Sequence, residues 1–405
     1  MYDSVKRRVV VLKTIPIEEL CSGMYVDSIA AQQGNLKITS RGRVSNEQQI
    51  NHLKRQGIKA LVIDLSKQLP NDEPASEPPL SPVEENIESQ PEVSFEDEIS
   101  VAVALHNKGK TLQKRLLESV SKGFPIDLAI PEEFTQNLVS SIDRNPNALL
   151  CMTKIREKDS YLLEHSLNVA ILLANFASHV ELTEEEVQEL ALSGFLHDIG
   201  KIKIPDAILH KPGRLDEQEM NVMRDHVYYG TKVLQEMGLP KSMIRTIGEH
   251  HERLDGYGYP EGARGDEISL FGRMIAIVDT YDAITADRCY KPGMPSQKAL
   301  QILLQDSPDK YDAELVKKFI KCIGIFPVGS LVKLNNEKIA MVIRQHPVHA
   351  TKPVVKVFYS VRGSHYVKPS ELDLQKSPTV KIEKAVTASE YKLDFNKYFS
   401  EAIAI

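Results

Sequence analysis

His197 and Asp198 stand side by side at the end of a segment with helical periodicity. Apolar residues recur on one face from Thr183 onward, and the same face continues to His197 and Asp198. Thr183 followed by Glu186 is typical of a helix N-cap, and we expect Gly200 to be the C-cap. An imidazole and a carboxylate therefore point into the core. Because burying both is costly unless a divalent cation compensates, the pair predicts a metal site if further ligands converge on it.

Further imidazoles and a carboxylate lie on the apolar faces of neighbouring predicted helices. These helices cover about residues 150–180, begin at Asp216 and Pro240, and run from about Ser269. Any one such side chain is more often a core residue than a ligand. Helices meeting at one core would, however, bring together a set of seven: His165, His197, Asp198, His226, His250, His251 and Asp279.

Seven ligands are too many for one four- or six-coordinate ion and suit two. Asp198 can span both ions with its two oxygens, which leaves about three other protein ligands for each. Imidazole and carboxylate without thiolate favour Fe, Mn, Zn, Co or Ni over Ca or Mg. Two such ions lower the pKa of a water held between them and clamp the oxygens of a phosphoryl group. The pattern thus indicates phosphate-ester chemistry.

Cationic and aromatic residues accompany these ligands. Lys201 comes three residues after Asp198, where it either contacts a phosphate or supports the reacting water; the alternative is a surface lysine. The glycines of the loop 252–260 allow tight turns and close approach of a ligand, although a plain surface loop has the same features. Arg288 and Lys291 flank an aromatic residue and suit an anion with a stackable base, or else a solvated helix end.

Composition and charge exclude several classes of protein. A hydrophobic fraction of 42% and a charged fraction of 26% indicate a globular protein, and a net charge of −6 gives no general attraction to DNA, RNA or an anionic membrane. The four cysteines form no CxxC pair, which argues against a disulfide framework and fits a reducing cytoplasm. With no apolar run of membrane-spanning length, we expect a cytoplasmic protein without membrane insertion.

A chain of 405 residues exceeds one ordinary core, and its composition changes along its length. We expect a small α+β unit over 1–66, either regulatory or structural, with strands at 9–12, 36–39 and 60–65 and a helix over 46–55. An acidic, proline-rich linker over 67–98 follows. Residues 99–326 are predicted to be helical, with helices over 102–120, 132–141 and 150–180 among others. A small β-rich appendage and tail covers 327–405, with strands at 330–334, 339–344, 354–359 and 366–368.

The sequence resembles the HD-GYP family, a branch of the HD superfamily of metal phosphohydrolases. The resemblance rests on His197-Asp198, on His250-His251-Glu252 and on Gly258-Tyr259-Pro260, with further matches at 202–213, 275–283 and 288–291. It covers about residues 150–325, and the first sixty-odd residues are similar to the small domain that often precedes HD-GYP domains in bacteria.

The resemblance implies a mainly α protein whose catalytic domain is an HD-type helical bundle. It also implies a cyclic di-GMP phosphodiesterase that yields the linear dinucleotide pGpG, with GMP as a further product. On this basis the seven residues above are metal ligands, Asp198 and Lys201 act in catalysis, and Lys201, Arg288, Lys291 and Tyr259 contact the substrate.

One departure from the family pattern concerns the number of metal ions. Members with three metals carry a Glu four residues before the first ligand histidine, where this sequence has Tyr161. Glu164 faces roughly 100° away from His165 on a helix and is a poor substitute. We therefore expect two divalent ions, with Fe or Mn favoured, and pGpG as the main product.

Two other interpretations stay open. One is a cyclic GMP-AMP phosphodiesterase on the same fold, since nothing in the sequence reads out base preference. The other is a weakly active protein that binds a cyclic dinucleotide, or a signalling partner such as a diguanylate cyclase (GGDEF) domain, through the loop 258–260. A complete ligand set with Lys201 favours an enzyme. Whether the chain forms a homodimer is also left open.

Overall fold

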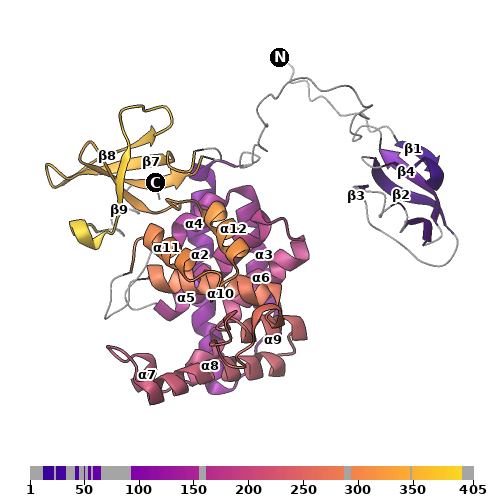
Figure 1. The fold of residues 1–405 in the computed structure, drawn as a ribbon, viewed down its shortest axis with the longest axis horizontal. Helices are drawn as coiled ribbons and strands as arrows, with labels where there is room; N and C mark the ends of the chain where they lie inside the picture. The colour runs from indigo at the N-terminus through magenta and orange to yellow at the C-terminus, as the bar shows by residue number, and fades with distance from the viewer. Residues whose placement is uncertain are drawn as a thin grey trace. The chain divides into compact units, whose positions relative to one another are not determined.

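The computed structural model describes residues 12–21, 24–32, 42–44, 50, 53–55, 58–64, 93–154, 161–286, 293–346 and 349–394. The chain divides into two compact units, residues 1–85 and 86–405, and each unit has its own hydrophobic core. The larger unit is a helical bundle followed by a small sheet (Figure 1). The expectation of a mainly α protein with a small α+β N-terminal part and a small β C-terminal part is confirmed.

The N-terminal unit contains a four-stranded antiparallel sheet in the order β1-β4-β2-β3. Its strands are β1 Leu12–Pro16, β2 Tyr25–Gln32, β3 Gly42–Arg43 and β4 Ile58–Asp64, and residues 50 and 53–55 are helical. The strand predicted at 60–65 is β4, whereas β2 was missed, because register shifts along β2 break the alternation of inward and outward residues. The predicted strand at 36–39 and most of that at 9–12 lie outside the described residues.

The helical bundle follows in the second unit. Its α-helices are α2 Phe95–Lys122, α3 Ala129–Arg144, α4 Pro146–Met152, α5 Tyr161–His179, α6 Glu184–Leu196, α7 Asp206–Leu209, α8 Glu217–Glu236, α9 Lys241–Gly248, α10 Leu270–Thr285, α11 Ser296–Gln305 and α12 Ala313–Ile323. Short 3-10 helices occur at η3 Ile199–Lys203 and η4 Gly265–Glu267. The predicted caps are confirmed at two helix starts, since α6 and α8 each open with a capping box, Thr183 with Glu186 and Asp216 with Glu219.

Helices α5 and α6 pack closely at the centre of the bundle. Nearly every residue of α5 from Glu164 to Ala177 is buried, so α5 is enclosed on all sides. Gly194 of α6 allows this packing, because a Cβ at this position would lie 3.0 Å from the backbone of Ala170 on α5. These two helices carry His165 and lead to His197.

Two local predictions were wrong. The single helix expected over 150–180 is broken: α4 ends at Met152, where the Thr153 hydroxyl donates to the Leu150 carbonyl at 2.7 Å, and α5 begins at Tyr161. Gly200 is not the C-cap of α6, because the C-cap is His197 and Gly200 lies within η3.

A five-stranded antiparallel sheet follows α12 in the order β8-β7-β6-β5-β9. Its strands are β5 Leu331–Leu334, β6 Lys338–Arg344, β7 Val354–Ser360, β8 His365–Asp373 and β9 Ile382–Val386, and a 3-10 turn, η5, covers Ser389–Tyr391. All four predicted strands are present, β8 being longer than expected, but β9 was missed because its outward residues give it little apolar pattern. The sheet shares its core with the bundle near α4, away from α7 and α8 (Figure 1).

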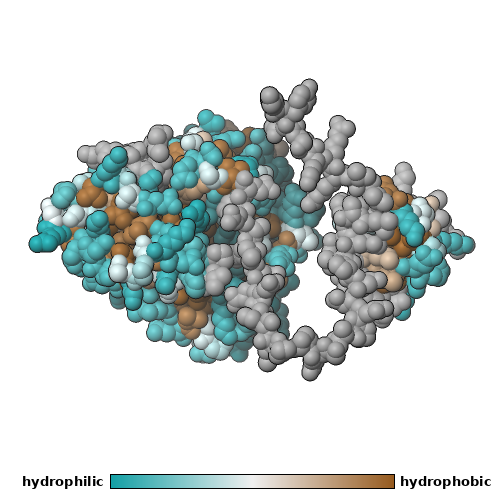
Figure 2. Space-filling view, turned by 90° about the horizontal axis from the view of Figure 1, so that it is seen from above, coloured by the Kyte–Doolittle hydropathy of each residue, from teal (hydrophilic) through white to brown (hydrophobic). Residues whose placement is uncertain are grey.

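On the face seen in Figure 2, hydrophilic residues are interspersed with patches of apolar residues. Among the described residues, every helix is too short or too polar to span a lipid bilayer.

Candidate metal centre

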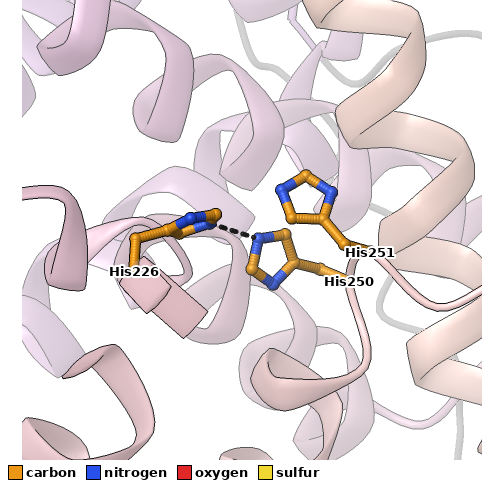
Figure 3. A group of neighbouring side chains, drawn as sticks. All are labelled: His226, His250 and His251. Carbon is orange, nitrogen blue, oxygen red and sulfur yellow. Dashed lines mark hydrogen bonds between the residues drawn. The ribbon is translucent and has the colours of Figure 1, made fainter. Parts of the chain in front are cut away.

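The structure brings the seven predicted ligands together in one cluster. His165 comes from α5, His197 and Asp198 from the end of α6, His226 from α8, His250 and His251 from the turn after α9, and Asp279 from α10. Three groups within the cluster have ligand atoms less than 4.8 Å apart: His226 with His250 and His251, His165 with His197 and Asp279, and His197 with Asp198 and His250. Figure 3 shows the rings of His226, from α8, and of His250 and His251, from the turn after α9, close together.

Asp198 lies between two sets of imidazoles. Its Oδ2 is 3.5 Å from His165 Nε2 and 3.3 Å from His197 Nε2. Its Oδ1 is 3.5 Å from His226 Nε2 and 3.9 Å from His250 Nε2. Each carboxylate oxygen thus faces a different pair of histidines, which is the arrangement expected of a group that spans two cations.

Asp279 makes a second link across the cluster. Its Oδ1 is 2.9 Å from His165 Nε2, and its Oδ2 is 3.6 Å from His251 Nδ1. Between them, the two carboxylates therefore contact all five imidazole rings.

Three of the histidines are oriented in the same way. The Nδ1 atoms of His197, His226 and His250 lie 2.8, 2.6 and 2.5 Å from the carbonyl oxygen three residues earlier, in Gly194, Met223 and Ile247 respectively. A ring that donates Nδ1–H to a carbonyl presents its unprotonated Nε2 on the opposite side. All three Nε2 atoms consequently face the cluster, and those of His226 and His250 lie 3.3 Å apart (Figure 3).

His165 is oriented by a carboxylate instead. Its Nδ1 lies 2.8 Å from Oδ2 of Asp282, and Asp282 is buried. No role for Asp282 was predicted from its position in the sequence. The available signal was its position three residues after Asp279 on the same helical face.

Burial favours the neutral form of three of the histidines, whereas both carboxylates favour the charged form. Burial, followed by the charge of Lys201, lowers the pKa of His226 to about 4, and burial lowers that of His251 to about 3. Burial alone would raise the pKa of Asp198, but nearby positive charge, including that of Lys201, holds it well below its usual value. These protonation states are those that metal ligands require.

The fit to metal ions rests on two atoms inside the cluster. His197 Nε2 and Asp198 Oδ1 are buried and have no hydrogen-bond partner among the described residues. Leaving such atoms unpaired costs roughly 1–3 kcal/mol each, more for a charged group. Because a cation between the imidazole nitrogens and carboxylate oxygens would satisfy both atoms, these residues fit divalent metal ions.

A glycine contact brings His226 to the cluster. Gly200 of η3 packs on α8 so closely that a Cβ there would lie 2.0 Å from the His226 carbonyl oxygen and 2.4 Å from the Gly230 nitrogen. Any side chain at 200 would therefore hold α8 away. The end of α6 is held by a second contact, because the side-chain amide of the buried Gln113 on α2 donates a hydrogen bond to the Phe195 carbonyl.

The loop after His251 is held by Glu252. The buried Glu252 carboxylate accepts the backbone N–H groups of Glu261, Gly262 and Ala263 at 2.7, 3.1 and 3.0 Å. Gly258 packs on the start of the same loop, where a Cβ would lie 2.4 Å from the Arg253 nitrogen. This fixes Tyr259, whose ring lies 4.6 Å from the His251 ring between centroids.

Of the other residues considered for the site, some lie at or near the metal cluster and some lie outside the described residues. Lys201 Nζ lies 2.5 Å from Asp198 Oδ2, at the cluster as expected. Glu164 is buried, and its Oε1 lies 3.9 Å from Nζ of Lys110, so this carboxylate forms an ion pair with a lysine. Arg288 and Lys291, and the side chain of Tyr161, lie outside the described residues.

Three family models match the chain in succession. A domain of unknown function, DUF3391, matches residues 12–129, an HD domain matches 149–315, and a KOW domain associated with the HD domain matches 331–394.

Related proteins match over much or part of the chain. The cyclic di-GMP phosphodiesterase PA4108 of Pseudomonas aeruginosa is 34% identical over 90% of this chain and 89% of its own. The 3'3'-cGAMP-specific phosphodiesterase 3 of Vibrio cholerae is 38% identical over 42% of this chain and 37% of its own. Among solved structures, Bd1817 of Bdellovibrio bacteriovorus matches 76% of this chain and 98% of its own with a TM-score of 0.48 and 16% identity. Because the first of these matches covers most of both chains, this chain belongs to the HD-GYP branch of the HD domain family.

Proposed function

We propose that this protein is a metal-dependent phosphodiesterase that hydrolyses cyclic di-GMP to pGpG. The proposal rests on the position of Asp198, because its two carboxylate oxygens face different pairs of imidazoles. When bound, two divalent ions supply a water of lowered pKa and positive charge for the phosphoryl oxygens.

The protein's own residues have distinct roles in this proposal. The five imidazoles and two carboxylates hold the ions, and the hydrogen bonds at Nδ1 aim the imidazoles of His165, His197, His226 and His250. Lys201 holds one oxygen of Asp198 and brings a positive charge to the edge of the cluster, where a substrate phosphate can meet it. Tyr259 covers His251 and lies at the edge of the cluster, where it can contact the substrate.

The cyclic dinucleotide is supported by the relatives, which include cyclic di-GMP and 3'3'-cGAMP phosphodiesterases. The long match to a cyclic di-GMP enzyme favours guanine at both positions, and cyclic GMP-AMP is the second candidate because shorter matches of similar identity carry that activity in their names.

Two ions rather than three, with Fe or Mn favoured, are part of the proposal. The absence of Glu at position 161 supports two ions, and the imidazole-rich donor set supports Fe or Mn. We also place the protein in the cytoplasm, which is supported by Cys21, Cys151 and Cys322 being outside any disulfide. A diguanylate cyclase partner and a homodimer stay predictions from the sequence.

Metal analysis and product chromatography test the proposal. Protein purified anaerobically should contain close to two metal ions per chain, and cyclic di-GMP should give pGpG before any GMP. Three ions per chain, or GMP without accumulation of pGpG, would contradict the two-metal form. Running cyclic GMP-AMP in parallel decides base preference.

Asp198→Ala should remove both metal and activity, because it removes the group that spans the two sets of imidazoles. Asp206→Ala is the matched control, since the Asp206 side chain is 95% exposed. Turnover retained in Asp198→Ala would show that the reaction takes place elsewhere.

A further inference from the structure

An arginine lies at the edge of the metal centre. Arg224 is on α8, two residues before His226, and its guanidinium carbon lies 5.3 Å from the centroid of the Tyr259 ring. The Tyr259 ring in turn packs on His251 with an interplanar angle of 37° and meets His226 edge-on at 6.4 Å. The guanidinium is therefore one aromatic ring away from two of the candidate ligands.

The charge of Arg224 is uncompensated within the described part of the chain. Its guanidinium donates a hydrogen bond to the neutral Asn221 Oδ1 at 3.3 Å, and no described carboxylate lies within ion-pair distance. Neighbouring arginines differ, because Arg245 pairs with Glu249 and Arg253 pairs with Asp255. Arg224 is also exposed, so its donors are accessible to an anion from solvent.

Tyr259 is a stable surface for the guanidinium to lie on. The hydroxyl of Tyr259 can donate a hydrogen bond. Its backbone N–H donates to the His251 carbonyl at 3.1 Å, which ties the ring to the metal centre. A planar guanidinium held over an aromatic face keeps its N–H groups directed outward in its own plane.

We propose that Arg224 and Tyr259 form a second anion subsite, which binds the phosphate of the cyclic dinucleotide that is not being cleaved. This inference rests on the proposed function. A cyclic dinucleotide carries two phosphates on one ring, so one phosphate must lie outside the metal cluster while the other reacts inside it. In a chain of net charge −6, that second phosphate needs a local cation. A guanidinium with free donors matches phosphate oxygens in pairs.

Two substrates separate this subsite from the metal centre. Bis(p-nitrophenyl) phosphate has one phosphodiester and cyclic di-GMP has two, so only cyclic di-GMP can occupy both positions. Arg224→Gln should lower kcat/KM for cyclic di-GMP about 10- to 100-fold more than for bis(p-nitrophenyl) phosphate, as expected for loss of charged hydrogen bonds. Arg224→Lys should recover part of the loss, because it restores the charge but not the planar pair of donors.

Arg115→Gln is the matched control. Arg115 is exposed on α2 and forms no ion pair among the described residues, so the substitution removes the same charge at a different place. This variant should keep the wild-type ratio of the two activities. Equal losses on both substrates in Arg224→Gln, or no loss on either, would overturn the second subsite.

Binding provides a readout that does not depend on turnover. Titration of the metal-loaded protein with a non-hydrolysable phosphorothioate analogue of cyclic di-GMP should show binding about 10- to 100-fold weaker in Arg224→Gln than in wild type. Wild-type binding that depends on Arg224 without any hydrolysis would refute the proposed activity and keep the subsite. Hydrolysis with unchanged binding in Arg224→Gln would do the reverse.

Discussion

Replacing Gly200 by alanine tests how the fold delivers His226 to the metal centre. The added Cβ would lie 2.0 Å from the His226 carbonyl oxygen, against at least 3.4 Å in an ordinary contact, so η3 and α8 must separate by about 1.4 Å. Metal–ligand distances tolerate deviations of only about 0.2 Å. The substitution should therefore remove His226 from the ligand set while leaving its chemistry intact.

The substitution should lower both the free energy of unfolding and the affinity for metal. Because the atoms in the way are backbone, the strain should cost about 3 kcal/mol or more of the free energy of unfolding. Metal analysis should show less than the wild-type content, and titration of the metal-free protein should show affinity reduced at least tenfold.

Gly230→Ala is the matched control on the opposite side of the same contact. A Cβ at Gly230 would lie no closer than 3.5 Å to Gly200, which is ordinary van der Waals contact. In the interior of a helix such as α8, alanine is also more stable than glycine by about 1 kcal/mol. This variant should be as stable as wild type or more so, with full metal content. Full metal content in Gly200→Ala would refute the reasoning.

Three other perturbations address different parts of the site. Asp282→Asn should weaken metal binding about 10- to 100-fold, because His165 loses the carboxylate that orients it, with little change in the Tm of the metal-free protein; unchanged affinity would remove Asp282 from this role. Glu252→Gln should expose residues 253–263 to faster amide hydrogen exchange and raise KM, because a single amide oxygen cannot accept three N–H groups, and wild-type exchange would contradict this. The metal-free protein should lose stability as the pH falls from about 6.5 towards 4, since His226 has a folded pKa of about 4 and an ordinary value of 6.5, so the unfolded state alone binds the proton in this range. His226 should contribute roughly 3 kcal/mol of this loss in urea titrations, in addition to the loss from His251, whose pKa is also lowered, to about 3. His226→Gln should therefore make the profile shallower by that amount, and an equally steep profile in that variant would place the effect elsewhere.

The chemistry of the site could be predicted from local patterns. The helical period showed which face of each segment is buried, and His165, His226 and Asp279 stood out because they are polar residues on such a face. Capping residues gave the starts of α6 and α8 independently of the motif. Both signals depend on residues within a few positions of one another along the chain.

The relations between segments could not be predicted in this way. Periodicity indicates that a face is buried but not which helix opposes it, so the contact of Gly200 with α8, the bond from His165 to Asp282 and the position of Arg224 over Tyr259 all required the structure. Short or irregular strands such as β2 and β9 were missed because pairing with distant strands holds them, rather than their own pattern.

The sequence by itself thus determined which side chains are inward-facing and what chemistry they can perform. Only the tertiary structure decided that Asp198 lies between two pairs of imidazoles, because this depends on distances set by the packing of four separate helices. Packing distances between helices arise from close contacts of residues far apart in the chain, and a single sequence does not record those contacts.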